Sequence, residues 1–231
     1  NELKKKKYKI YGSSRNKNKY SDFIIDFKNP NFNLKKLKKL GIKIIIHQVS
    51  LNQNDSKRYP KLAKKISVNG TTKLLELAKE INAEKIIYLS TSQVYGKNLN
   101  GIVSEKTKTI PINTYSIIHR QVEEICSRNS QYFKNGIFVL RLSNIMGSPQ
   151  RKNKKFWKLV CNDLCLQAVK NKEIILNSDG KQYRDFLSIY NLIEVIEKII
   201  ETKKFKNKTH FFNIGSGKSI TIMELAKIIK K

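Results

Sequence analysis

The sequence predicts an α/β fold in which a doubly wound parallel sheet is covered by helices on both faces. Two observations support this prediction. Short β-branched runs alternate with helical stretches along the chain of 231 residues, which is the pattern of repeated βαβ units. The segments 42–46, 85–90 and 136–142 are almost wholly apolar, as expected of strands that are buried on both faces of a sheet.

The individual elements are predicted from two periodicities. Strand segments are short runs rich in β-branched and aromatic residues, whereas helical segments carry apolar residues three or four positions apart, as at Leu74, Leu75 and Ala78. The predicted strands are 8–11, 22–27, 42–46, 85–90, 136–142, 173–176 and 210–214. The predicted helices are 57–82, 114–129, 156–170, 190–202 and 222–230.

A change of composition near residue 148 divides the chain into two regions. The stretch "SPQRKNKK" at 148–155 combines Pro, polar residues and a run of charges, which is typical of a boundary. The pattern before it is regular α/β, and the elements after it are shorter and more mixed.

The formal net charge of +29 at pH 7 has two interpretations. A strongly basic chain is typical of proteins that bind nucleic acid or another polyanion. Alternatively, the excess of Lys, Asn and Ile reflects compositional drift, because the lysines are spread along the chain and do not cluster on one element. We favour drift, so nucleic acid is not the expected partner.

The remaining composition predicts a globular cytoplasmic protein without a membrane span or a metal site. No apolar run reaches the roughly 18–20 residues that cross a bilayer, and the first residues do not resemble a signal peptide. The three cysteines are expected to be reduced, and the three histidines are too scattered along the chain to form a metal site.

Two segments have a spacing typical of a catalytic site. The stretch "YLSTSQVYG" ends a predicted strand with the hydroxyl of Thr91, and "TYSIIHRQVEE" begins a predicted helix with Tyr115 and His119. Residues four apart on a helix are neighbours, so His119 lies one turn from Tyr115. By spacing alone, the three residues are better explained as a strand-end hydroxyl, an exposed helix aromatic and a solvated histidine.

Eight blocks, in this order, resemble the extended short-chain dehydrogenase/reductase family, which includes NAD-dependent epimerases, dehydratases and reductases of nucleotide sugars. The blocks are "YKIYGSSR", "DFIIDF", "IIIHQVS", "SVNGTTKLLELAKE", "KIIYLSTSQVYG", "VLRLSNIMG", "GKQYRDFLSI" and "FFNIGSGKSITIMELA". The match covers nearly the whole chain. It implies a partial Rossmann-like domain in 1–148 that binds NAD or NADP, and part of a small substrate-binding lobe with returning elements in 149–231.

The sequence departs from the family pattern in two ways. The family begins with a strand, a glycine-rich turn and a helix, and this first βα unit has no counterpart here, because the G-x-G-x-x-G fingerprint is absent. Residues 1–7 resemble the end of that helix, and the chain stops near the helix of the last block, so we expect a fragment. The second departure is His119, where most members carry a lysine.

The resemblance implies a role for each matching side chain. Tyr115 would be the acid/base, Thr91 would hold the substrate oxygen, and His119 would modulate Tyr115 and contact the cofactor ribose. The cofactor would also contact Arg15, Asp26, Asn69 and Ser90, and the substrate would contact Ser92, Gln93, Asn144 and Arg184. Arg15 would meet the 2′-phosphate of NADP. A homodimer would form through the helices 57–82 and 114–129.

Some of these residues also have ordinary structural interpretations. Arg184 would pair with Asp185 on the surface, Asn144 would cap a turn, and Asn69 would satisfy its own backbone.

The proposed chemistry needs a phenol that ionises near neutral pH. A tyrosine that removes a hydroxyl proton while hydride leaves the same carbon needs a pKa well below its free value of about 10. A cation within about 4–6 Å favours the phenolate, and His119 is the cation that the spacing offers, although a histidine is only partly charged at neutral pH. Acidic residues are absent beside Gln93, which argues against elimination chemistry.

We therefore predict an NAD(P)-dependent oxidoreductase of the epimerase/dehydratase type that acts on a nucleotide sugar. One alternative is a non-catalytic, basic Rossmann-like protein that binds RNA or another polyanion. The other is an inactive fragment.

Overall fold

The chain forms two units, which the computed structural model describes over residues 3, 8–97, 101–148, 156–203 and 205–230. Unit 1 contains the described residues up to Arg141 together with Ile196–Asn213. Unit 2 contains Leu142–Val195 and the described residues from Ile214 onward. Most of the predicted boundary at 148–155 lies outside the described residues, and the second predicted region contributes Ile196–Asn213 to unit 1.

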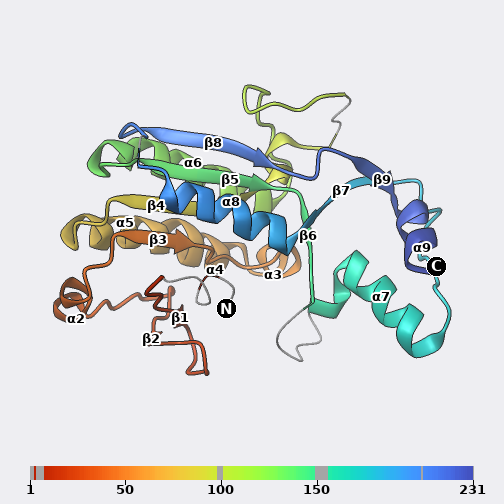
Figure 1. Cartoon of the computed structure of the whole chain (residues 1–231), viewed down its shortest axis with the longest axis horizontal. Helices are drawn as coiled ribbons and strands as arrows, with labels where there is room; N and C mark the ends of the chain where they lie inside the picture. Colours follow the sequence, from red (N-terminus) through yellow and green to blue (C-terminus); the bar gives the residue numbers. More distant parts are fainter. Residues whose placement is uncertain (1–2, 4–7, 98–100, 149–155, 204, 231) are drawn as a thin grey trace. The chain divides into compact units, whose positions relative to one another are not determined.

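The central sheet of unit 1 has four strands in the order β3-β4-β5-β8. Their bounds are Ile44–His47 for β3, Lys85–Thr91 for β4, Ile137–Leu142 for β5 and Thr209–Ile214 for β8. β3 and β4 are parallel, with His47 opposite Tyr88, and the arrows of β5 and β8 run the same way in Figure 1. The predicted parallel sheet is confirmed, and β4 and β5 are buried along most of their length.

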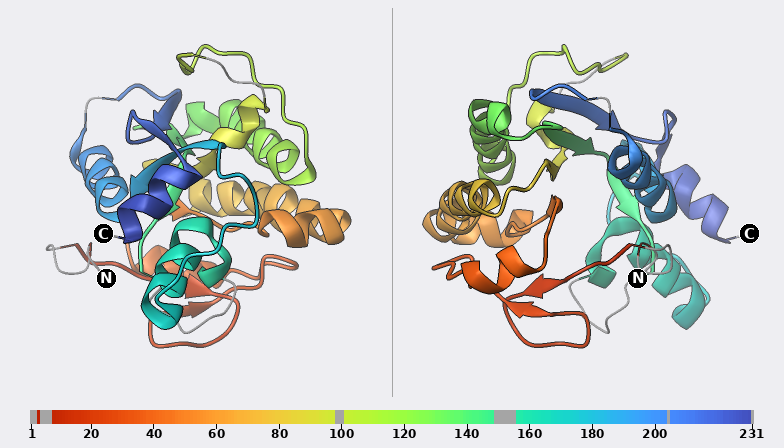
Figure 2. Two further views of the ribbon diagram at one scale, coloured as in Figure 1. Left: turned by 90° about the vertical axis from the view of Figure 1, so that its right-hand side faces the viewer. Right: turned by 60° about the vertical axis from the view of Figure 1, so that its left-hand side comes forward.

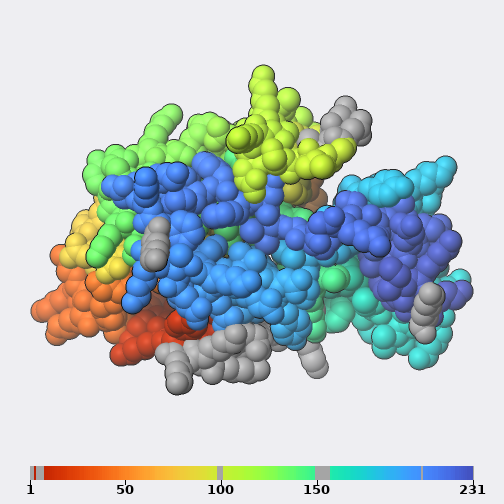
Figure 3. Space-filling view, turned by 45° about the horizontal axis from the view of Figure 1, so that its top comes forward, coloured from red at the N-terminus to blue at the C-terminus, as the bar shows by residue number. Residues whose placement is uncertain are grey.

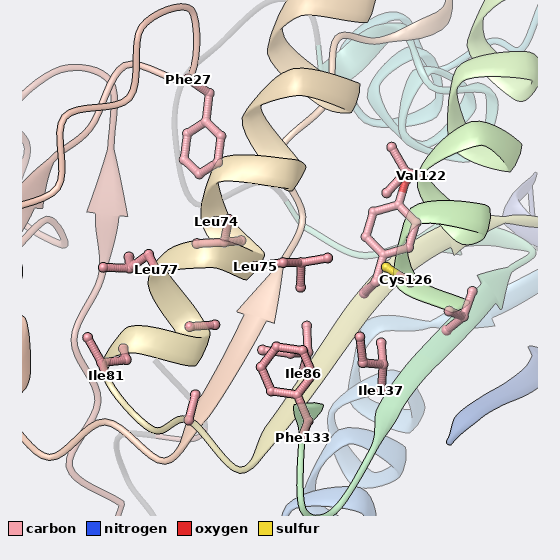
Figure 4. Close-up of a cluster of buried hydrophobic side chains, with 14 of the residues drawn as sticks. Phe27, Leu74, Leu75, Leu77, Ile81, Ile86, Val122, Cys126, Phe133 and Ile137 are labelled. Atoms are coloured by element: carbon pink, nitrogen blue, oxygen red, sulfur yellow. The ribbon is translucent and has the colours of Figure 1, made fainter. Parts of the chain in front are cut away.

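Helices cover both faces of this sheet, as Figures 1 and 2 show. One face carries α5 (Gly70–Glu80) and α6 (Thr114–Asn129), and the other carries the part of α8 (Ile189–Glu201) that belongs to unit 1. Figure 4 shows the apolar side chains that fill the space between the sheet and the first pair of helices, among them Leu75, Ile86, Val122 and Ile137. Their burial stabilises the parallel arrangement that positions the strand ends.

The first half of the predicted helix 57–82 is divided into short pieces. They are α3 (Gln53–Arg58), α4 (Pro60–Lys64) and a π-helical turn at Lys65–Asn69, which leads into α5. Pro60 begins α4, because proline is tolerated in the first turn of a helix but not in its interior.

The N-terminal segment departs from the prediction in the position of its first strand and in the length of its second. β1 (Ser13–Ser14) and β2 (Phe23–Ile24) pair in parallel as a separate sheet, whereas 8–11 and 22–27 were predicted. The short helix α2 (Leu34–Lys39) was not predicted, because its sequence "LKKLKK" has one turn of apolar spacing only.

In its described residues, unit 2 contains a small mixed sheet, two complete α-helices and the first part of α8, Ile189–Val195. The strands β6 (Asn144–Met146), β7 (Tyr183–Ser188) and β9 (Ser219–Thr221) form the order β6-β7-β9, with β6 parallel and β9 antiparallel to β7. The helices are α7 (Val160–Asn171) and α9 (Ile222–Lys230). The predicted strand 173–176 is wrong. Ile174 and Leu176 are apolar because they pack against the cluster between α7 and α9, without strand pairing.

A buried lysine of β4 fixes the end of α8 within unit 1. Lys85 is 2% exposed, and its ammonium group donates to the carbonyl oxygens of Ile199, Ile200 (3.2 Å) and Thr202 (2.8 Å). The last carbonyl groups of a helix lack intrahelical donors, and a cation satisfies them and favours the negative end of the helix dipole.

We expect Lys85→Met to lower the free energy of unfolding by about 2 kcal/mol, because one buried and two half-buried carbonyl groups lose a charged donor while the packed volume changes little. Urea unfolding followed by circular dichroism measures this. Lys43→Met is the matched control, since Lys43 is exposed and pairs with Glu84 on the surface, and its effect should stay within about 0.5 kcal/mol. Equal stability of the two variants would contradict the capping role.

Candidate active site

The elements β4 and α6 position two hydroxyl groups side by side. Thr91 is the last residue of β4, at the carboxyl edge where parallel sheets place their sites. A capping box begins α6: Asn113 Oδ1 accepts from the Ser116 amide at 2.9 Å, and Ser116 Oγ accepts from the Asn113 amide at 3.3 Å. Tyr115 therefore lies in the first turn of α6, and its phenol is near enough to the hydroxyl of Thr91 for that hydroxyl to lower the pKa of Tyr115.

A column of aromatic and imidazole rings leads through the interior to Tyr115. Phe27 stacks on His47 with 5.7 Å between ring centroids, His47 on Tyr88 at 5.6 Å, and Tyr88 on His119 at 5.8 Å. The column ends where the ring of Tyr115 meets His119 edge-on at 4.4 Å. His119 is therefore beside Tyr115, as the spacing predicts.

The charge expected on His119 is wrong for the chain as described. His119 is 3% exposed, and burial lowers its pKa to about 4, so its ring is neutral near pH 7. Burial also raises the pKa of Tyr115, and the hydrogen bond from Thr91 only partly offsets this. The spacing correctly predicts that His119 is a neighbour of Tyr115. It does not reveal how far His119 is removed from solvent when α6 packs against the sheet.

The buried histidines make stability depend on pH. His47 and His119 both have a folded pKa of about 4, below the usual 6.5, so between these values the unfolded chain binds protons that the folded chain excludes. The free energy of unfolding therefore falls as pH drops through this window. Between about pH 7.5 and about pH 5, the free energy of unfolding should fall by about 2 kcal/mol less in His119→Gln than in the unsubstituted protein. Urea unfolding at the two pH values measures this difference. Parallel pH dependences of the two proteins would contradict the neutral, buried state of His119.

A second buried network links β4, α6 and β5. Glu123 is fully buried and accepts from Ser90 Oγ at 2.7 Å, from Arg141 Nε at 3.0 Å and from Arg141 Nη2 at 2.7 Å. Arg141 also donates to Tyr95 Oη at 2.8 Å, and Tyr95 donates to Asn213 Oδ1 at 2.6 Å. Ser90 thus has a protein partner, and its predicted contact with the cofactor stays a prediction. The sequence analysis missed this network, although a lone arginine inside the apolar strand "IFVLRL" was a signal for it.

The predicted substrate residues of unit 1 lie close to the start of α6. Gln93 accepts from Asn113 Nδ2 at 3.3 Å and donates to Gln53 at 3.4 Å. Ser92 is half-buried beside it. The backbone N–H of Gln93 also donates to Thr91 Oγ1 at 3.2 Å, so the turn after β4 holds the Thr91 side chain in place.

Three predicted cofactor residues lie on other segments of unit 1. Arg15 is exposed after β1, and Asn69 is exposed in the π-helical turn. The carboxylate of Asp26 accepts from the Lys28 amide at 2.9 Å. Within the described part of the chain, none of the three hydrogen-bonds to the residues around Tyr115, so their predicted roles stay predictions.

The remaining predicted residues belong to unit 2. Asn144 Nδ2 donates to the backbone oxygen of Asp185 at 3.0 Å. The carboxylate of Asp185 accepts from the backbone of Ser216 (2.9 Å) and Gly217 (3.0 Å), not from Arg184. The guanidinium of Arg184 bonds to the two residues before it and lines a cavity of about 240 Å³.

A larger surface basin, of about 500 Å³, lies in unit 1 between α6 and the loop around residues 105–109. Figure 3 shows this part of the chain (yellow-green) exposed at the surface. Arg120 donates to Thr109 at 3.0 Å and pairs with Glu124 at 3.5 Å. Charges of both signs line the basin, among them Glu105, Lys108 and Arg128.

The described residues contain neither a membrane-spanning helix nor a cluster of metal ligands. None of their helices is both long and apolar enough to cross a bilayer. No three potential metal ligands among them lie close enough to share an ion.

The chain is similar to known proteins over most of its length. The sequence model of the "NAD dependent epimerase/dehydratase family" matches residues 1–215. An uncharacterized UDP-glucose epimerase, YtcB, of Bacillus subtilis is 27% identical over 71% of this chain and 49% of its own length. A putative UDP-glucose 4-epimerase of Methanocaldococcus jannaschii is 27% identical over 95% of this chain and 70% of its own length. The chain thus spans from about half to about seven-tenths of these relatives.

Solved structures resemble the fold. The UDP-glucuronic acid 4-epimerase of Bacillus cereus, in complex with UDP-glucuronic acid and NAD, has a TM-score of 0.75 and 28% identity, covering 93% of this chain and 67% of that one. The UDP-glucose 4-epimerase of Thermotoga maritima, with UDP-glucose, has a TM-score of 0.81 at 21% identity, covering 99% and 76%. The second likeness concerns the fold alone.

Proposed function

The chain belongs to the NAD-dependent epimerase/dehydratase family, and from this we propose that its protein oxidises or epimerises a nucleotide sugar with Tyr115 as the acid/base. The observation that carries the proposal is the placement of Thr91, the last residue of β4, beside the phenol of Tyr115 in the first turn of α6. Two hydroxyl groups so placed can hold one substrate hydroxyl and transfer its proton.

The residues around Tyr115 suit a dinucleotide. His119 Nε2 is buried and has no hydrogen-bond partner among the described residues, and a ribose hydroxyl would satisfy it. When bound, oxidised NAD supplies a hydride acceptor and a positively charged ring. Because His119 is neutral, the described side chains beside Tyr115 offer no charge to ionise it, so we expect phenolate formation to depend on occupancy of the site.

Substrate positions follow from the same proposal. Thr91 would hold the reacting hydroxyl toward Tyr115, and Gln93 and Ser92 would contact the sugar. In unit 2, Arg184 would meet a phosphate of the nucleotide, because a guanidinium at a cavity suits phosphate oxygens. The substrate class proposed is a UDP- or dTDP-linked sugar, after the relatives that carry those names.

Binding and turnover test the proposal. The protein should quench or enhance NADH or NADPH fluorescence on binding, and UDP-glucose or UDP-glucuronic acid should reduce the bound oxidised cofactor. Thr91→Ala should lower that rate while leaving cofactor affinity within about threefold, because it removes one substrate hydrogen bond. Binding to RNA that survives high salt, with no dinucleotide binding, would instead support the polyanion alternative, which the family match does not favour.

A homodimer through 57–82 and 114–129 also stays a proposal. Tyr59 and Ile117 are apolar side chains on these segments with 45% and 41% of their surface exposed. Light scattering of the purified protein measures its mass, and a monomer at all accessible concentrations would rule the dimer out.

A further inference from the structure

The ring column contains one hydrogen bond whose direction can be assigned. Tyr88 Oη lies 2.7 Å from His119 Nδ1, and both side chains are almost completely buried. Burial keeps the phenol protonated, since it raises the pKa of Tyr88. Among the described residues, the acceptor for the Tyr88 hydroxyl proton is Nδ1 of His119. A ring proton on Nδ1 would leave the buried phenol proton without an acceptor, an arrangement that folded proteins avoid.

The other ring nitrogen must then carry the imidazole proton. A neutral imidazole has one N–H, so the proton of His119 resides on Nε2. This nitrogen is buried and lacks a hydrogen-bond partner among the described residues. The ring of Tyr115 lies against the same imidazole. A buried donor without a partner is rare in folded proteins and indicates a group that arrives from outside the chain.

We propose that Tyr88 is a positioning residue that holds His119 in the Nε2–H tautomer, so that this N–H donates to a ribose hydroxyl of a dinucleotide bound beside Tyr115. The ligand in this inference rests on the proposed function. Most family members would donate from a lysine cation, whereas His119 donates as a neutral group. His119 stands where most members carry the lysine, and Tyr88 on β4 determines which of its ring nitrogens carries the proton.

His47 provides an internal reference. Its Nε2 lies 2.8 Å from Thr71 Oγ1, and the Thr71 hydroxyl donates to the Ser67 carbonyl oxygen. The Thr71 oxygen therefore accepts, and His47 also has its proton on Nε2, independently of Tyr88. Because His47 stacks against the Tyr88 ring, its spectrum reports whether a substitution at Tyr88 disturbs the column.

Nitrogen NMR of histidine-labelled protein tests the tautomer without any ligand. Two-bond correlations between ring protons and nitrogens show which nitrogen is protonated, and the chain has three histidines to assign. We expect His119 to carry its proton on Nε2, and Tyr88→Phe to populate the Nδ1–H form while the His47 spectrum is retained. A proton on Nδ1 in the unsubstituted protein, or an unchanged tautomer in Tyr88→Phe, would overturn the assignment.

Cofactor affinity tests the donor. His119→Leu removes the N–H and should weaken NADH binding about tenfold, whereas His119→Gln offers an amide N–H near the position of Nε2 and should weaken it about threefold or less. Equal losses in the two variants would overturn the donor role. Failure of the unsubstituted protein to bind either dinucleotide would overturn that role together with the proposed function, and the NMR spectra would still decide the tautomer.

Discussion

Tyr115→Phe is expected to lower the rate of substrate-dependent cofactor reduction by about 10²–10⁴-fold, because it removes the proton acceptor of the proposed reaction. The packing should change little, since the ring that meets His119 edge-on is retained. Single-turnover absorbance measurements with bound oxidised cofactor give the rate, and NADH titration gives the affinity. The affinity should change far less than the rate, because the lost group acts in the transition state.

Tyr132→Phe is the matched control for this prediction. Tyr132 is 58% exposed on the surface, where the Lys79 ammonium lies over its ring. Loss of its hydroxyl should leave both the rate and the affinity unchanged. Equal rates for Tyr115→Phe and Tyr132→Phe would remove Tyr115 from the reaction.

Glu123→Gln is expected to lower the free energy of unfolding by about 3–5 kcal/mol, the usual effect of leaving a buried charge without its partner. Arg141 is 5% exposed and directs two of its nitrogens to this carboxylate. Whole domains are stable by only about 5–15 kcal/mol, so the variant should unfold at much lower urea concentration. Glu124→Gln, on the exposed side of the same helix, should change stability by less than about 1 kcal/mol.

A double variant distinguishes the effect of the Glu123–Arg141 charge pair from the effect of the volume that the two side chains fill. Glu123→Leu with Arg141→Met replaces both charges with apolar side chains of similar size, and it should recover much of the stability lost by Glu123→Gln. A double variant that is as unstable as the single one would show that the hydrogen bonds to Ser90 and Tyr95, rather than the charge pair, hold this region together.

The sequence was sufficient to predict the central sheet and the proximity of Thr91 to Tyr115. Apolar runs such as "IIYL" are set by burial on both faces of a strand, so they identify β4 and β5 directly. The resemblance of the blocks around Thr91 and Tyr115 to the family pattern predicts both groups at one edge of the sheet, whereas their spacing alone does not. Short polar strands such as β9 carry no comparable pattern, and the apolar segment 173–176 imitated a strand because packing against helices selects the same residues.

Tertiary packing alone decided the protonation of the site. Spacing along α6 makes His119 a neighbour of Tyr115. Packing against β4 excludes water from His119, and Tyr88 on that strand supplies the hydrogen bond that fixes the position of its proton. The partnership of Glu123 with Arg141 likewise joins a helix to a strand. Charge in a protein interior depends on desolvation and on partners distant in the sequence. The sequence therefore determined that His119 and Tyr115 are neighbours, and the tertiary structure determined which buried side chains carry charge.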